Sequence, residues 1–284
     1  MITVLLPGVP AIINDPAARI RLADLADWMD SVDKKLDRSL SWPNRDGESD
    51  QDPVYDAARY PVVSGSIFAE SDAELPEFRR SLMALKQYSS KFTMEVTDSE
   101  GTLQAEVQLA GKIRFSVVEE NRYATFSVPL LATDPVKYSM PRNLVTGLPS
   151  SGGGLTYPLV GAGGALDYGV NGDLGRVTVS NAGDARVWPT VTVSGELGSG
   201  FFYQRLDTGE VVRYDRIVPL GSTVTVDHRT GEVLVDNDSD GSTYLTQFDF
   251  FSAGPGESFD VQFNAIGASS GGPQMTVTVA DGYF

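Results

Sequence analysis

Alternating apolar and polar side chains mark one long strand near the middle of the chain, within Asn121–Ser139. Phe126, Val128 and Leu130 share one face of this segment, as in a half-buried strand. Asp134-Pro135 ends the pattern, because proline gives no backbone N–H to a ladder and holds the preceding residue extended. The composition changes soon afterwards. We therefore expect the last strand of a first domain here.

The residues before this strand predict one helix among several strands. Leu75, Phe78, Leu82 and Leu85 form an apolar stripe at helical spacing, and Asp72 is the expected N-cap. Apolar residues at helical spacing continue into Trp28–Leu40, but we leave this segment open between a helix and a loop. A glycine, Gly65, lies inside one predicted strand and is typical of a bulge. The predicted strands are Met1–Leu6, Arg19–Leu25, Tyr60–Glu70, Lys91–Thr97, Leu103–Leu109 and Ile113–Val117.

Short predicted strands alternate with glycine-containing turns throughout the second half, and this pattern predicts a β-sandwich. The predicted strands are Val177–Val179, Val187–Gly195, Phe201–Leu206, Val211–Tyr214, Thr223–Asp227, Glu232–Asp236, Phe259–Phe263 and Met275–Val279. Gly147–Gly154 reads GLPSSGGG, a composition typical of a flexible linker. We therefore expect a first domain over residues 1–142, a linker over 143–154 and a second domain over 155–284.

Several short motifs occur in this order of elements. The first half contains VxGxIxA at Val63–Ala69 before the leucine-spaced helix, and DP-x-KYS at Asp134–Ser139. The second half contains TYPL within Leu155–Leu159, then N-x-G at Asn181–Gly183 and a PG turn at Ala253–Ser258. Together they resemble the distal tail proteins, also called minor tail proteins, of long-tailed bacteriophages with siphovirus-type tails. The resemblance covers nearly the whole chain and is weakest over residues 23–57. Glu257-Ser258 stands where the family more often has asparagine.

The resemblance implies a mainly β fold, with an N-terminal tail-tube-like β domain that carries one helix and a C-terminal galectin-like β-sandwich. It implies a structural virion protein of the tail tip: a hub ring, hexameric like the tail tube, joining the tube to the baseplate or receptor-binding apparatus. The implied partners are other copies of the chain, the tail tube protein and tail-tip or baseplate proteins, with DNA only passing through the channel. Assembly would occur in the host cytoplasm. The alternative is a carbohydrate-binding module for host-surface attachment, with Tyr203, Tyr214 and Tyr244 as a stacking patch.

Composition narrows the classes of partner. The chain has 284 residues, a net charge of −16 and no cysteine, so disulfides, thiolate metal sites and cysteine nucleophiles are excluded. Acidic charge opposes stable binding to nucleic acid or to anionic lipid. We expect neither a signal peptide nor a membrane span. The second half holds seven arginines and no lysine, which is a further sign of a domain change.

Candidate chemistry is sparse. His228, the single histidine, lies in a predicted hairpin turn and is expected at the surface. Asp236, Asp238 and Asp240, followed by Gly241, match the opening of a calcium loop, although the twelfth position is Gln247 where a bidentate glutamate is required. An ordinary hairpin turn explains the same residues. We therefore predict no tight metal site, no cofactor and no enzymatic activity.

Overall fold

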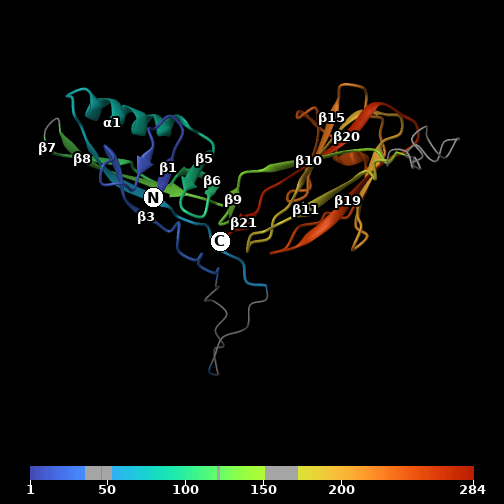
Figure 1. Cartoon of the computed structure of the whole chain (residues 1–284), viewed down its shortest axis with the longest axis horizontal. Helices are drawn as coiled ribbons and strands as arrows, with labels where there is room; N and C mark the ends of the chain where they lie inside the picture. Colours follow the sequence, from blue (N-terminus) through green and yellow to red (C-terminus); the bar gives the residue numbers. More distant parts are fainter. Residues whose placement is uncertain (36–45, 47–52, 120–121, 151–171) are drawn as a thin grey trace, which may run out of the picture. The chain divides into compact units, whose positions relative to one another are not determined.

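The computed structural model describes residues 1–35, 46, 53–119, 122–150 and 172–284. Its contacts divide the chain into two compact units, Met1–Met140 with Phe284, and Pro141–Tyr283. Figure 1 shows both units as β structures, the first with one long helix. Within the described residues, no helix combines the length and the apolar character that crossing a membrane requires.

The first unit is a β-barrel. Its strands are β1 (Thr3–Leu5), β2 (Ile12–Ile13), β3 (Ile20–Ala26), β4 (Val62–Phe68), β5 (Phe92–Thr97), β6 (Thr102–Leu109), β7 (Arg114–Glu119), β8 (Tyr123–Leu131) and β9 (Lys137–Ser139). Neighbouring strands follow the order β6-β5-β1-β2-β3-β4-β8, and β8 closes the ring on β6 through Gln108↔Leu131 and Leu109↔Leu130. The β2–β3 pair is parallel, and the other pairs in this ring are antiparallel.

The barrel core is completed by the helix α1 (Glu74–Ala84) and the 3-10 turn η2 (Leu85–Gln87). Leu75, Phe78, Leu82 and Leu85 are buried, which confirms the predicted apolar stripe. The ring of Phe78 meets that of Phe126 on β8 edge-on, with centroids 5.1 Å apart. The predicted cap by Asp72 is wrong. Ala73 is the N-cap residue without a side-chain bond, and the carboxylate of Glu74 instead accepts bonds from the Glu70 N–H and the Ser71 hydroxyl.

The bulge expected near Gly65 lies on the strand beside it. The register of β3 against β4 shifts between Leu22 and Asp24, directly opposite Gly65 and Ser64. A Cβ on Gly65 would lie 2.2 Å from the Arg21 carbonyl oxygen and 2.7 Å from Phe126 Cζ. Glycine is therefore required here because the neighbouring backbone and ring approach too closely for any side chain. Of the open segment Trp28–Leu40, residues 28–35 are not helical and the remainder lies outside the described residues.

The second unit is a sandwich of two antiparallel sheets. The six-stranded sheet has the order β10-β20-β12-β15-β16-β17 and the five-stranded sheet β11-β19-β13-β14-β18. The bounds are β10 (Arg142–Gly147), β11 (Arg176–Ser180), β12 (Thr190–Leu197), β13 (Phe201–Arg205), β14 (Val211–Tyr214), β15 (Thr223–Asp227), β16 (Val233–Val235), β17 (Ser239–Asp240), η3 (Ser242–Tyr244), β18 (Leu245–Phe248), β19 (Ser258–Ala265), β20 (Ser269–Val279) and β21 (Gly282–Tyr283). Alternate residues of both sheets, such as Val191, Val193, Phe259 and Val261, are buried between them.

One stretch differs from the expected linker. Residues 143–147 belong to strand β10, which pairs with β20 from Arg142↔Val279 to Gly147↔Gln274. The sequence did not predict this strand, because glycine- and serine-rich residues follow it directly. Its partner strand also lies more than a hundred residues further along the chain. Ser150 remains tied to the unit, since its N–H donates to the Asp173 carbonyl. The predicted TYPL segment, Leu155–Leu159, lies outside the described residues.

Candidate functional surfaces

Two aspartates of the calcium-like motif, Asp236 and Asp240, accept hydrogen bonds from backbone N–H groups. Asp236 and Asn237 adopt positive φ angles of 53° and 58° after β16. Asp236 Oδ1 accepts from the Thr223 N–H at 2.7 Å, and Asp240 Oδ1 accepts from the Ser242 N–H at 2.8 Å. The bonds from Ser242 lower the pKa of Asp240. Among the described residues, no three His, Asp or Glu side chains gather as metal ligands would. This geometry favours the hairpin-turn interpretation.

The twelfth position of the motif also lies away from this turn. Gln247 is on β18 in the five-stranded sheet, and its amide donates to Asp249 Oδ2 at 2.7 Å. We predict that calorimetric titration with calcium gives no binding in the micromolar range, because ligand number and charge set calcium affinity. Micromolar binding that Asp238→Ala abolishes would contradict this prediction.

His228 is not at the surface, so the sequence prediction is wrong on this point. Only 3% of the residue is exposed. Nδ1 accepts a bond from the Phe251 N–H at 3.1 Å, and Nε2 lies 2.8 Å from the Tyr203 hydroxyl. Because Nδ1 accepts, the neutral imidazole carries its proton on Nε2 and donates it to Tyr203. Burial lowers the pKa of His228 to about 4. The segment Phe250–Phe251 covers the turn, which no local pattern reveals.

The three tyrosines that could have formed a sugar-stacking patch differ in how far they are buried. Tyr203 and Tyr214 are 0% and 1% exposed, and their rings stack near that of Phe201 in the core of the sandwich. Burial raises the pKa of Tyr203. Tyr244 is half-buried, with the Arg216 guanidinium 4.2 Å from its ring centroid. Two of the three rings are therefore unavailable to stack on a sugar.

The N-x-G motif and the PG turn meet in space through Asn181. This side chain is 1% exposed. Its amide nitrogen donates to the carbonyl oxygens of Ala185, Ala253 and Gly254, and its Oδ1 accepts from the N–H groups of Gly183 and Gly282. A Cβ on Gly183 would lie 1.8 Å from the Gly282 carbonyl oxygen, so the motif requires glycine there. The motif residues that carry the family resemblance therefore fasten three segments of the sandwich.

Sequence reasoning missed a buried arginine beside this turn. Arg205 is 6% exposed and lies 3.9 Å above the ring of Phe259. Its guanidinium pairs with Asp207 and Glu257 and donates to the Ser252 carbonyl. Glu257 also accepts from the Gly254 N–H at 2.6 Å, and this bond together with Arg205 lowers its pKa. Glu257 thus holds the turn through an ion pair with Arg205 and a bond from the Gly254 N–H.

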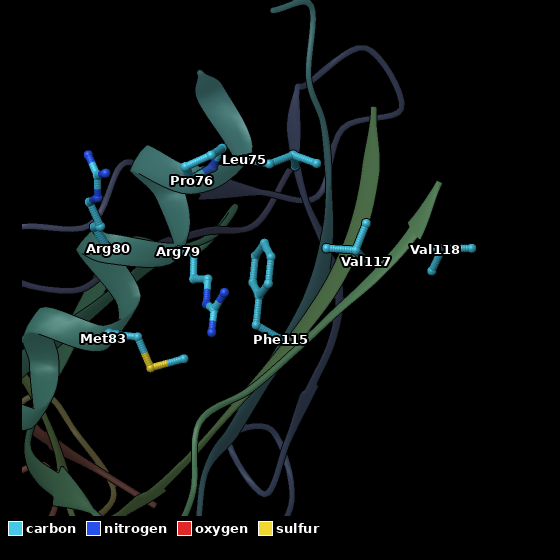
Figure 2. Close-up of a pocket in the computed structure, with 8 residues that line it drawn as sticks. All are labelled: Leu75, Pro76, Arg79, Arg80, Met83, Phe115, Val117 and Val118. Atoms are coloured by element: carbon cyan, nitrogen blue, oxygen red, sulfur yellow. The ribbon is translucent and has the colours of Figure 1, made fainter. Parts of the chain in front are cut away.

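A groove of about 790 Å³ lies between α1 and β7 in the first unit. It is lined by Leu75, Pro76, Arg79, Arg80, Met83, Phe115, Val117 and Val118. Figure 2 shows Arg79, Met83 and Phe115 pointing into the space between helix and strand. Val117 and Val118 are 56% and 64% exposed. We call this surface the α1–β7 groove.

A second exposed surface follows β3. The backbones of Asp33–Lys35 and Tyr55–Ala57 are hydrogen-bonded to each other, and Lys34 pairs with Asp56. Arg59, 1% exposed, fastens this segment by donating to the carbonyl oxygens of Asp27, Trp28 and Asp30. Large side chains remain outside, with Met29, Tyr55 and Tyr60 at 54%, 67% and 57% exposed. We call Met29, Tyr55 and Tyr60, with Asp30 and Asp33, the acidic patch.

Comparison with solved structures gives a match that extends over both units of the chain. No protein-family model matches the sequence, and no curated protein matches it. The chain is similar to the Dit protein (gp 19.1) of phage SPP1, described as a paradigm of the hub adsorption apparatus in phages infecting Gram-positive bacteria. The match has a TM-score of 0.57 at 12% identity and covers 93% of each chain. A chain of the phage P2 baseplate in its activated, calcium-bound conformation matches with a TM-score of 0.49 at 10% identity, covering 98% of each chain. The predicted fold class is confirmed: the chain has the mainly β, two-part fold of the SPP1 Dit protein.

Proposed function

We propose that this protein is a structural component of a phage tail tip, where it joins the tail tube to the baseplate or receptor-binding apparatus. The observation that carries the proposal is the likeness to the SPP1 Dit fold along 93% of both chains, barrel and sandwich included. The motifs N-x-G and PG, which resemble those of distal tail proteins, support it because they fasten the sandwich together through Asn181. Fold likeness alone does not assign function, so a direct test is needed.

We propose that such a protein acts by presenting binding surfaces and not by catalysing a reaction. His228 and Tyr203, two titratable side chains whose pKa values burial shifts strongly, are bonded to each other inside the sandwich and contribute to its packing. We propose a closed ring of the first unit, with six copies as in the tails of the family that the sequence resembles. A cyclic ring repeats one heterologous contact until it closes. A net charge of −16 suits a channel through which DNA passes without being held.

The test is the position of the protein in the particle. A tag placed after Phe284, whose side chain is 41% exposed, is expected to label one site per virion at the tail tip in electron micrographs. Label along the tube, on the capsid, or absent from particles would overturn the proposal. A matched tag on a capsid protein controls for access of the label.

A further inference from the structure

The α1–β7 groove has the features of a surface that is covered in the assembled state. Strand β7 pairs with β8 along one edge, and within the described residues no strand occupies its other edge. Val117 and Val118 on this strand are more than half exposed. Edge strands with exposed apolar side chains invite association and are usually protected by charge, by proline or by a covering element. Here the groove beside β7 is itself apolar at its base, through Leu75, Met83 and Phe115.

Three exposed arginines lie beside this apolar base. Arg79 and Arg80 line the groove and are exposed, as is Arg114 at the start of β7. In the described part of the chain, none of the three forms an ion pair with a carboxylate. The groove therefore fits a partner that presents apolar side chains beside carboxylates.

The first unit carries such a surface elsewhere on itself. The acidic patch presents Met29, Tyr55 and Tyr60 beside Asp30 and Asp33. The described residues of this segment, 27–35 and 53–60, hold four acidic side chains (Asp27, Asp30, Asp33 and Asp56) and three basic ones (Lys34, Lys35 and Arg59). Lys34 pairs with Asp56 and Arg59 is buried, so Asp30 and Asp33 are the exposed carboxylates on which the patch depends. Figure 1 shows α1 above the label of β3 and β7 at the far end of the barrel, so the groove and the chain that follows β3 lie at separate places on one copy. Two different complementary patches per subunit are what a closed ring needs.

We propose that the α1–β7 groove of one copy binds the acidic patch of the next copy, and that this contact, repeated, closes the ring proposed above. The inference rests on the proposed ring and names its contact surfaces. Tyr55, Met29 or Tyr60 fills the apolar base beside Phe115, while Asp30 and Asp33 face Arg79 and Arg80. The charges select the partner and the apolar side chains supply the buried area.

The first test uses the absence of cysteine from the chain, because only introduced thiols react. The full-length Val118→Cys/Tyr55→Cys variant, treated with a bis-maleimide cross-linker, is expected to give a ladder of oligomers in a denaturing gel. The matched control is Val118→Cys/Tyr88→Cys, since Tyr88 is also an exposed tyrosine of the first unit, at 46%. A ladder no stronger than that of the control overturns the proposed contact.

The second test reverses the charges. On the Val118→Cys/Tyr55→Cys background, Arg79→Glu/Arg80→Glu and Asp30→Lys/Asp33→Lys are each expected to weaken the ladder by roughly tenfold or more, because like charges then face each other. Mixing the two variants is expected to restore the ladder. The reversed groove of one variant then meets the reversed patch of the other, and the unchanged surfaces meet at the next contact of an alternating ring. The charge-matched control Lys86→Glu/Lys91→Glu, at exposed positions away from the groove, keeps its ladder. Circular dichroism checks that both variants are folded. If the ladder of the folded variants is lost and mixing them does not restore it, the proposed pairing of these surfaces is wrong.

The outcomes separate this inference from the proposed function. Labelling at the tail tip with no specific ladder keeps the proposed function and overturns these contact surfaces. A specific ladder with no label at the tail tip keeps the contact and overturns the proposed function.

Discussion

Replacing Asn181 by alanine is expected to lower the free energy of unfolding of the second unit by about 4 kcal/mol, since several buried groups lose their partners at once. The carbonyl oxygens of Ala185, Ala253 and Gly254 and the N–H groups of Gly183 and Gly282 all bond to this one side chain. A buried polar group left unsatisfied costs about 1–3 kcal/mol, and part of the loss is recovered where water enters. In calorimetry the transition of this unit should fall by about 10 °C.

The matched control is Asn143→Ala. Asn143 lies on β10 of the same unit, is exposed, and its side chain accepts one bond, from the Thr278 hydroxyl at 2.9 Å. Its replacement is expected to change stability by less than about 0.5 kcal/mol, as for most surface substitutions. If Asn181→Ala were as mild as Asn143→Ala, the three segments would be held together by other contacts.

Lowering the pH from 7 to 4 is expected to remove about 3 kcal/mol of stability through His228 alone. Burial lowers the pKa of this side chain from 6.5 to about 4 in the folded chain, with the bond from the Phe251 N–H and the charge of Asp227 acting in the opposite direction. Between these two values the unfolded chain binds a proton that the folded chain does not. The contribution of His228 is therefore complete above pH 6.5 and declines as the pH falls towards 4.

Denaturant unfolding at a series of pH values measures this effect. The pKa values of Asp207 and Glu257 are also lowered, by their bonds to Arg205 and Gly254. The stability that these carboxylates contribute declines only at a lower pH than 6.5, where the loss through His228 begins. The slope between pH 6.5 and about 5 thus reports mainly on His228. His228→Gln, which does not titrate, should flatten the slope in that interval. An equal slope in both chains would show that the imidazole is not shielded from water.

The sequence predicted the strands of this fold where burial is one-sided, and it failed where the deciding partner is distant. Phe126, Val128 and Leu130 alternate because β8 has one face in the barrel core, so their period of two is visible locally. Strand β10 has no such pattern, since its register depends on β20. The burial of His228 depends on Phe251, 23 residues away, and Asn181 meets Gly282 across 101 residues. The motif N-x-G therefore showed that Asn181 matters without showing which groups it holds.

The place of β20 in its sheet has a consequence for synthesis. Ser269–Val279 lies between β10 and β12, so a strand made after 268 other residues occupies the interior of the six-stranded sheet. Until β20 has been made, β10 lacks its partner strand and β12 pairs with β15 alone, so the edge of β12 that β20 will occupy stays open. Proteins in which strands pair with distant segments fold slowly, and they expose apolar surface until the pairing is complete. The barrel, whose closing strand β8 ends at Leu131, can be complete long before the sandwich has emerged. Nascent chains stalled before Ser269 should therefore bind chaperones through their second unit, while their first unit already resists protease.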